Sequence, residues 1–112
     1  MHIVYKDKDV EKICNDINEA KKKYPTKIAK KLMKVINFIK SADSLQDIIQ
    51  YSPFYFHDLK GKRKGQYAID IDGRRSSYRL ILKPMNENST DIYANAKSIE
   101  IIMVWEVSKH YE

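Results

Sequence analysis

The feature that most constrains this chain is a change in the spacing of its apolar residues. Between residues 9 and 39 the apolar side chains recur every three or four positions, which is the spacing of amphipathic helices. From residue 66 onward they alternate with polar or small residues, or form a continuous apolar run, as they do in strands. Helices and strands segregated in this way are typical of an α+β domain.

The helical half divides into two helices at Pro25. The first is predicted over residues 9–20, with Asp7 or Asp9 as its N-cap, and the second runs to about Ile39. Proline disfavours helix in the residue before it but fits well at a helix start. Most lysines of the second helix lie away from its apolar stripe. We therefore expect an antiparallel helical hairpin with a cationic outer surface.

The second half is expected to supply three strands. Residues 66–72 and 77–83 lie on either side of an Asp72-Gly73 turn signal and should form a hairpin, although the loop could extend through Arg75. Residues 99–107 form the last strand. Because this segment is apolar on both faces, it should occupy an interior position in its sheet.

Two shorter elements complete the predicted fold. Residues 3–5 suit a short opening strand, and a capping box from Ser44 to Asp47 predicts a short helix over residues 45–50. No linker divides the chain, so we expect a single domain over residues 1–112. The predicted fold is α+β, with two N-terminal helices packed on one face of a small antiparallel sheet in the order βααβββ. The opposite face of the sheet would be left to bind something.

Positive charge is concentrated in two blocks of a chain whose net charge is +6. Residues 21–40 carry eight lysines and no acid, and residues 57–83 carry eight cations against three aspartates. This distribution suits a polyanion such as nucleic acid, or an acidic protein partner. A simple solvated lysine face is the alternative for the first block.

The same sequence argues against membrane insertion and disulfide chemistry. The most apolar stretch, residues 99–107, is too short to span a bilayer and contains two glutamates. A single cysteine, Cys14, cannot form an internal disulfide and has no neighbour at metal-ligand spacing, so we interpret it as a small core residue. We expect a cytoplasmic protein that needs no metal and no cofactor.

Residues suited to phosphate chemistry gather between His57 and Lys83. His57 lies three positions before Lys60 in a basic loop that ends at Gly65. On the strand that follows, Arg79 and Lys83 share one face, whereas Tyr78, Leu80 and Leu82 point towards the helices. Arg79 could instead pair with Asp70 across the hairpin, because an arginine in mid-strand must find an acid or an anion.

Metal-free RNA cleavage needs these residue types. The 2′-hydroxyl must lose a proton, the phosphorane carries added negative charge, and the departing 5′-oxygen must gain a proton. A histidine can carry such protons near neutral pH, as can a lysine whose pKa is lowered. The planar fork of an arginine suits the charge on the phosphate. A histidine three residues before a lysine is nevertheless common, so spacing alone is a weak signal.

A family resemblance adds to this chemistry. Residues 57–71, read as His-Asp-Leu-Lys-Gly-Lys-Arg-Lys-Gly-Gln-Tyr-Ala-Ile-Asp-Ile, together with Tyr78-Arg79-Leu80, resemble the plasmid-maintenance killer toxins of the RelE superfamily, especially HigB. The final segment, residues 99–112, also resembles the closing strand of that family. The helical half resembles it only in layout.

The resemblance implies an activity and a set of partners. The activity would be that of a type II toxin, cleaving mRNA in the ribosomal A site without a metal. The partners would be a HigA-like antitoxin, which often carries a helix-turn-helix, the 70S ribosome with its mRNA, and operator DNA reached through the antitoxin. His57 and Lys60 match the catalytic loop of the family, and Arg79 matches its strand arginine.

The C-terminus departs from the family pattern. HigB-like toxins tend to end in Asp-Tyr-His, whereas this chain ends in Lys109-His110-Tyr111-Glu112. His110 and Tyr111 therefore stay candidates whose catalytic roles are open. For RNA binding we expect six further cations, with solubility as the competing account of those in the loop: Lys62, Arg63, Lys64, Arg74, Arg75 and Lys83. Trp105 alternates with Met103 and Val107, so we expect it in the core and not on a base-stacking surface.

Two alternative functions remain at this point. A gyrase inhibitor of the ParE type would share the layout, but those proteins tend to lack the His-Lys pair in the loop. A basic RNA-binding or ribosome-binding module without catalysis would explain the charge and not the motif.

Overall fold

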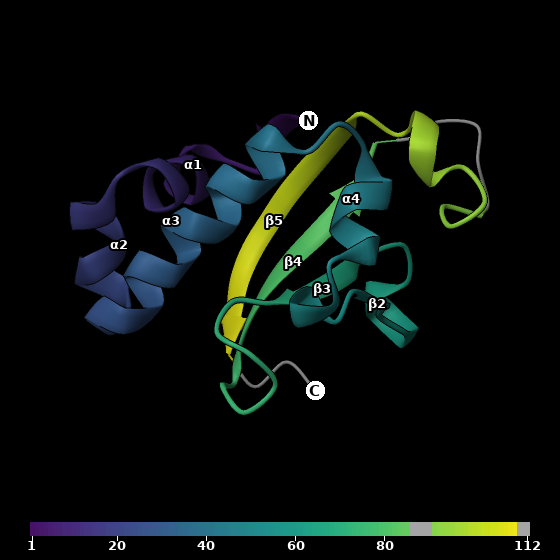
Figure 1. Ribbon diagram of the computed structural model, residues 1–112. Coiled ribbons are helices and arrows are strands. Elements are labelled where there is room, and N and C mark those ends of the chain that lie inside the picture. Colours follow the sequence, from purple (N-terminus) through teal and green to yellow (C-terminus); the bar gives the residue numbers. More distant parts are fainter. Residues whose placement is uncertain (86–90, 110–112) are drawn as a thin grey trace.

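The computed structural model describes residues 1–85 and 91–109 and contains a five-stranded sheet (Figure 1). The strands lie in the order β1-β5-β4-β3-β2. Their bounds are β1 His2–Tyr5, β2 His57–Asp58, β3 Tyr67–Asp70, β4 Tyr78–Pro84 and β5 Ile101–Lys109. β5 lies between β1 and β4, which confirms the interior position expected from its apolar sequence. The predicted α+β class is confirmed as well, but β1 runs parallel to β5, so the sheet is mixed and not antiparallel throughout.

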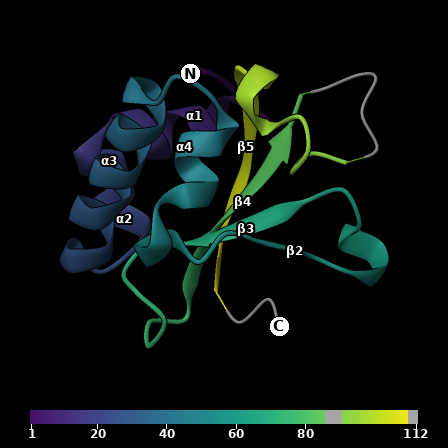
Figure 2. The same ribbon diagram turned by 45° about the vertical axis from the view of Figure 1, so that its right-hand side comes forward.

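Four α-helices accompany the sheet over the described residues. They are α1 Lys8–Asn15, α2 Ile17–Lys23, α3 Thr26–Ser41 and α4 Leu45–Gln50, and three short 3-10 turns follow at Ser52–Phe54, Gly61–Arg63 and Ala96–Ser98. Helices α1, α2 and α3 form one group beside β1 and β5 (Figure 1), and α4 follows α3 and lies next to it in Figure 2. Strand β2 is at the edge of the sheet farthest from that group (Figure 2).

The prediction of one continuous helix over residues 9–20 is wrong, because the chain breaks at Asp16. The Asp16 backbone is extended, and its Oδ1 accepts hydrogen bonds from the backbone N–H groups of Asn18 at 2.9 Å and Glu19 at 3.4 Å. An aspartate that caps a new helix competes with continuation of the old one. The apolar spacing runs on through this break and so conceals it. Asp7 is the N-cap of α1, as expected.

Helix α4 has the predicted bounds, with a different pattern of capping. The Ser44 side chain makes no capping hydrogen bond; instead, Oδ2 of Asp47 accepts a hydrogen bond from the backbone N–H of Asp43 at 2.8 Å. The acidic half of the expected capping box is therefore present, one residue earlier than the pattern predicts.

The main hydrophobic core lies between the helices and one face of the sheet. Helix residues such as Leu32 and Ile39 pack there against strand residues such as Leu80, Leu82 and Ile102, all of them fully buried. Cys14 belongs to the same core, as expected. The alternation predicted for β4 is thus confirmed, since Leu80 and Leu82 face the helices.

The other face of the sheet carries a second, much smaller apolar cluster. Its buried members are Leu59, Ala68 and Ile81, and Trp105 packs against them. We call this side of the sheet the open face. The expectation that Trp105 lies in the core is met only in part, because Trp105 packs against this small cluster and not, as Val107 does, against the main core.

A β-bulge in β5 causes this difference. Leu82 of β4 is in register with Val104, but its neighbour Ile81 is in register with Glu106, so Trp105 is the extra residue between two paired positions. A bulge shifts the alternation of side chains by one position. Trp105 and Glu106, although consecutive, therefore both lie on the open face.

Candidate active site

His57 lies on the edge strand β2, on the open face of the sheet. It is in register with Ala68 of β3, which is in register with Ile81 of β4. Its Nδ1 lies 2.8 Å from the backbone oxygen of Tyr55. A carbonyl oxygen can only accept a hydrogen bond, so Nδ1 carries the proton. In the neutral ring the lone pair is then on Nε2, which makes Nε2 the atom that could take up a proton.

A buried ion pair joins β3 to β4 beside this histidine. Asp70 and Arg79 are in register, and Nε of Arg79 lies 3.0 Å from Oδ1 of Asp70. Arg79 is 3% exposed and Asp70 is 2% exposed. The cross-hairpin pairing considered from the sequence is therefore present.

The two terminal nitrogens of Arg79 are directed at the backbone of the β3–β4 loop, whereas Nε has no hydrogen-bond partner among the described residues. Its Nη1 donates to the carbonyl oxygens of Tyr78 at 2.9 Å and Gly73 at 3.4 Å, and also to that of Ser76. Its Nη2 donates to the carbonyl oxygen of Arg74 at 3.2 Å. The guanidinium group thus holds the loop closed around itself. In this arrangement Arg79 shapes the site more than it presents charge to a ligand.

Arg74 is the accessible arginine of the same network. Its Nη1 donates to Oδ1 of Asp70 at 3.1 Å, yet its side chain is 49% exposed. The guanidinium carbon lies 3.8 Å from the centre of the Tyr55 ring, which is a cation–π contact. Arg74 is therefore oriented by two partners while it stays open to solvent and to a phosphate.

Tyr55 connects the network to His57 and is a residue that sequence reasoning missed. Its ring is 53% exposed and its centre lies 5.1 Å from that of His57. Its backbone is left-handed, with φ of 47°, which is costly for a residue other than glycine. The sequence gives no signal for this conformation, because tyrosine has no preference for it.

Burial and charge act in opposite directions on Asp70. Removal from water raises the pKa of its carboxyl group, whereas Arg79, Arg74 and His57 lower it. The second oxygen, Oδ2, is buried without a hydrogen-bond partner among the described residues. Asp70 is consequently the point where His57 and both arginines interact electrostatically.

The basic loop after β2 has two kinds of cation. Lys60, Lys62 and Lys64 are exposed. Arg63 is half-buried, forms an ion pair with Glu106 of β5, and donates to Oε1 of Gln66 at 3.0 Å. The lysines thus present their charge to solvent, while Arg63 fastens the loop to the sheet.

Four predicted residues are still to be placed: Arg75, Lys83, His110 and Tyr111. Arg75 is exposed in the β3–β4 loop. Lys83 is exposed on β4, where its Nζ lies 5.8 Å from the centre of the Trp105 ring. His110 and Tyr111 lie outside the described residues, so their predicted roles stay predictions.

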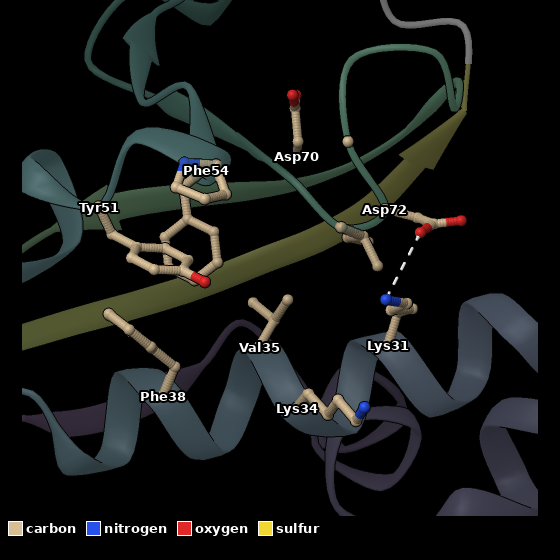
Figure 3. Close-up of a pocket in the computed structure, with 11 residues that line it drawn as sticks. Lys31, Lys34, Val35, Phe38, Tyr51, Phe54, Asp70 and Asp72 are labelled. Atoms are coloured by element: carbon tan, nitrogen blue, oxygen red, sulfur yellow. Dashed lines mark ion pairs between the residues drawn. The ribbon is translucent and has the colours of Figure 1, made fainter.

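A separate hollow of about 290 Å³ lies on the other side of the sheet. Val35 and Phe38 of α3 line one side, and Tyr51 and Phe54 line another (Figure 3). Lys31 and Asp72 form an ion pair at its rim, 3.9 Å apart, and Asp70 turns its carboxylate away from it (Figure 3). The hollow therefore borders the Asp70 network, but the Asp70 carboxylate does not point into it.

The structure of residues 1–85 and 91–109 bears on metal binding and on membrane insertion. No group of three or more His, Cys, Asp or Glu side chains is arranged to hold a metal ion in that part of the chain. None of the helices described there is both long enough and apolar enough to cross a bilayer.

Comparisons with known proteins agree with this architecture. A solved structure described as a YoeB/ParE toxin from Agrobacterium tumefaciens superposes with a TM-score of 0.53 over 99% of this chain and 100% of that one, at 14% identity. At this identity the likeness shows the fold alone. No curated protein matches the sequence. The family described as the RelE-like toxin of the type II toxin–antitoxin system HigB matches residues 3–97. Because that match covers most of the chain, the protein belongs to the HigB-like family of RelE-like toxins.

Proposed function

We propose that this toxin is a ribosome-dependent endoribonuclease that cuts mRNA in the cytoplasm without a metal. The observation that carries the proposal is the position of His57. Its Nδ1 is fixed by the Tyr55 carbonyl oxygen, and the Asp70–Arg74–Arg79 network lies beside it. A proton carrier of fixed tautomer next to phosphate-binding groups is what transesterification of RNA requires.

In the proposed reaction the 2′-oxygen attacks the adjacent phosphorus and the bond to the 5′-oxygen breaks. A 2′,3′-cyclic phosphate and a free 5′-hydroxyl result. One proton leaves the 2′-hydroxyl and one reaches the departing 5′-oxygen, and His57 carries one of them through Nε2. General acid–base help of this kind contributes roughly 10²–10⁴-fold to the rate.

Arg74 and Arg79 are proposed to have different roles. Arg74 is the better candidate for direct contact with the phosphate, since its side chain is 49% exposed whereas that of Arg79 is 4% exposed. Arg79, expected to act on the phosphate itself, is proposed instead to position Arg74 and the loop through Asp70 and the loop carbonyls. Lys60 is an exposed cation in the loop after β2 and would add positive charge near the reacting group.

The second proton carrier is proposed to come from His110 or Tyr111. Lys109, the last described residue, is in register with Tyr78, the neighbour of Arg79. The chain therefore leaves β5 at the end of the sheet where Arg79 lies. Lys62, Lys64 and Arg75 are proposed to contact ribosomal RNA, because they are exposed cations on the loops around His57.

Mapping of mRNA ends in cells tests this function. Induction of the wild-type chain should create new 5′ ends within translated codons, and the His57→Ala variant should create far fewer. His2→Ala is the matched control, because His2 is an exposed histidine on β1 at the opposite edge of the sheet. Intact mRNA together with DNA breaks would contradict the proposal and favour a gyrase inhibitor of the same fold.

The family also implies an antitoxin, and a type II antitoxin is a protein that binds its toxin. We propose a HigA-like antitoxin encoded beside this gene, with a helix-turn-helix through which the pair binds operator DNA. Coexpression of the adjacent reading frame should restore growth, and the two proteins should copurify. Growth arrest that persists, with no copurifying protein, would contradict this partner.

A further inference from the structure

Trp105 is a half-buried aromatic side chain on the open face of the sheet. The β-bulge in β5 places it there, together with Glu106, on the same side as His57. Bulges occur often next to active sites, where they redirect a side chain. The bulge lies beyond residues 3–97, the part of the chain that matches the family, so this feature is argued from this chain alone.

Two lysines lie on either side of this ring. Lys6 follows β1, and its backbone N–H donates to the carbonyl oxygen of Val104 at 3.1 Å, while Lys83 is on β4 in register with Met103. Their ammonium groups lie over the Trp105 ring, 4.7 Å and 5.8 Å from its centre, and make cation–π contacts with it. Because β1 and β4 flank β5, the indole has one cation on each side.

Neither Lys6 nor Lys83 forms an ion pair within the described part of the chain. Three carboxylates nevertheless line the same hollow as Lys6. Asp7 accepts the Val10 backbone N–H as the cap of α1, and Glu106 is paired with Arg63. Asp9, in the first turn of α1, lines the same hollow as Lys6. An aromatic ring between two unpaired cations suits a base with a phosphate on each side.

We propose that Trp105, Lys6 and Lys83 form a binding site for one nucleotide of single-stranded RNA. The base takes the place of the ammonium groups over the indole, and the two lysines turn from the ring to contact the phosphates on its 5′ and 3′ sides. This inference rests on the proposed function for its ligand class. It deepens that function by adding a contact away from the reacting phosphate.

The site can be placed relative to His57 along the sheet. His57, Ala68, Ile81 and Glu106 form one row across β2, β3, β4 and β5, and Trp105 adjoins the last position of the row. Three strand spacings amount to about 14 Å. The stacked base therefore belongs to a nucleotide other than the one whose phosphate is cut.

Fluorescence tests the site directly, because Trp105 is the single tryptophan of the chain. The protein carries His57→Ala so that RNA is not consumed, and the probe is a short oligoadenylate at low salt. We expect RNA to quench the fluorescence. The double variant Lys6→Ala/Lys83→Ala should weaken binding at least tenfold and lower the slope of log affinity against log salt by roughly one unit or more.

Two further variants separate stacking from support of the small apolar cluster. Trp105→Leu keeps an apolar side chain over that cluster and should weaken binding of labelled RNA at least fivefold. Trp105→Phe should stay within about threefold of the parent, since a smaller ring still stacks. Lys21→Ala/Lys30→Ala is the charge-matched control on exposed helix positions, and it should bind as the parent does.

Three results would overturn the site. These are no quenching by RNA, equal weakening by the two double-lysine variants, or quenching by the purified antitoxin in place of RNA, which would assign the surface to a protein. The proposed function fails separately. If the wild-type chain leaves mRNA intact but RNA still quenches Trp105, the nuclease proposal falls and the binding site stands.

Discussion

The two faces of the sheet are built from the same strands and differ in almost every other respect. On the covered face, alternate residues such as Leu80 and Leu82 enter a large apolar core with the helices. On the open face, the residues between and beside them include Arg79 and Ile81, and the described residues place three buried apolar side chains there. The open face instead holds the Asp70 network, His57 and Trp105.

The difference shows how one hairpin serves stability and binding at once. The covered face is stabilised by apolar burial. Its free energy grows roughly with the buried area, and it tolerates exchanges between apolar side chains of similar volume. The open face depends on a few specific polar contacts, in which loss of one partner leaves another buried and unpaired. The two faces should therefore respond differently to substitution.

The largest expected effect is on catalysis. His57→Ala should lower the rate of mRNA cleavage in a reconstituted translation reaction by roughly 10²–10⁴-fold, because it removes a proton carrier. It should change the free energy of unfolding by less than about 1 kcal/mol, since His57 lies on a two-residue edge strand outside the main core. A rate within about threefold of that of His2→Ala would remove His57 from the mechanism.

The next effect is on the buried ion pair. Asp70→Asn should lower the free energy of unfolding by about 3 kcal/mol, because it leaves Arg79 buried without a charge partner. Urea denaturation measures this loss. The double variant Asp70→Asn/Arg79→Gln should recover part of the loss. A double variant less stable than Asp70→Asn would show that the carbonyl contacts of Arg79, and not its charge partner, dominate.

Substitution of two neighbouring residues on β4 allows a direct comparison of the two faces. Leu80 and Ile81 are both fully buried, Leu80 against the helices and Ile81 in the small cluster. Leu80→Ala should cost about 3–5 kcal/mol of unfolding free energy, and Ile81→Ala about 2 kcal/mol, because a small cluster at the surface can collapse around the gap. Equal losses in urea denaturation would mean that the open face is packed as firmly as the covered one.

The last effect is absent at neutral pH and concerns the thiol of the covered face. Burial raises the pKa of the Cys14 thiol to about 12. The unfolded thiol therefore ionises first, so the free energy of unfolding should fall above about pH 9 by about 1.4 kcal/mol per pH unit, until the folded thiol also ionises near 12. Comparison with Cys14→Ala in pH-dependent denaturation isolates this contribution. Rapid alkylation of the native protein at pH 8 would show instead that the thiol is accessible.

Much of the secondary structure could be predicted from local patterns. The bounds of α4, the Asp7 cap and the strands near residues 67–70, 78–84 and 101–109 follow from capping residues and apolar periodicity. The exception at Asp16 is a case in which local side-chain capping prevails over an unbroken apolar pattern. The family was also indicated by sequence, through the motif from His57 to Leu80.

The arrangement of the candidate site could be predicted only in part. The sequence placed Arg79 and Lys83 on one face and allowed for a pair with Asp70, because alternation along a strand is a local property. It could not show that Arg79 closes the loop around itself, nor that Tyr55 orients both His57 and Arg74. Those contacts join residues whose separation in space depends on loop geometry.

The sequence by itself determined the α+β class, the family and the residue types available on the open face, since each of these depends on the local spacing of residues and on a local motif. Only the tertiary structure decided which of those residues meet. Strand register set the Asp70–Arg79 pair, and one bulge moved Trp105 out of the pattern it shares with Val107 and onto the face of His57. Register and bulges depend on pairing between distant segments, which local periodicity does not encode.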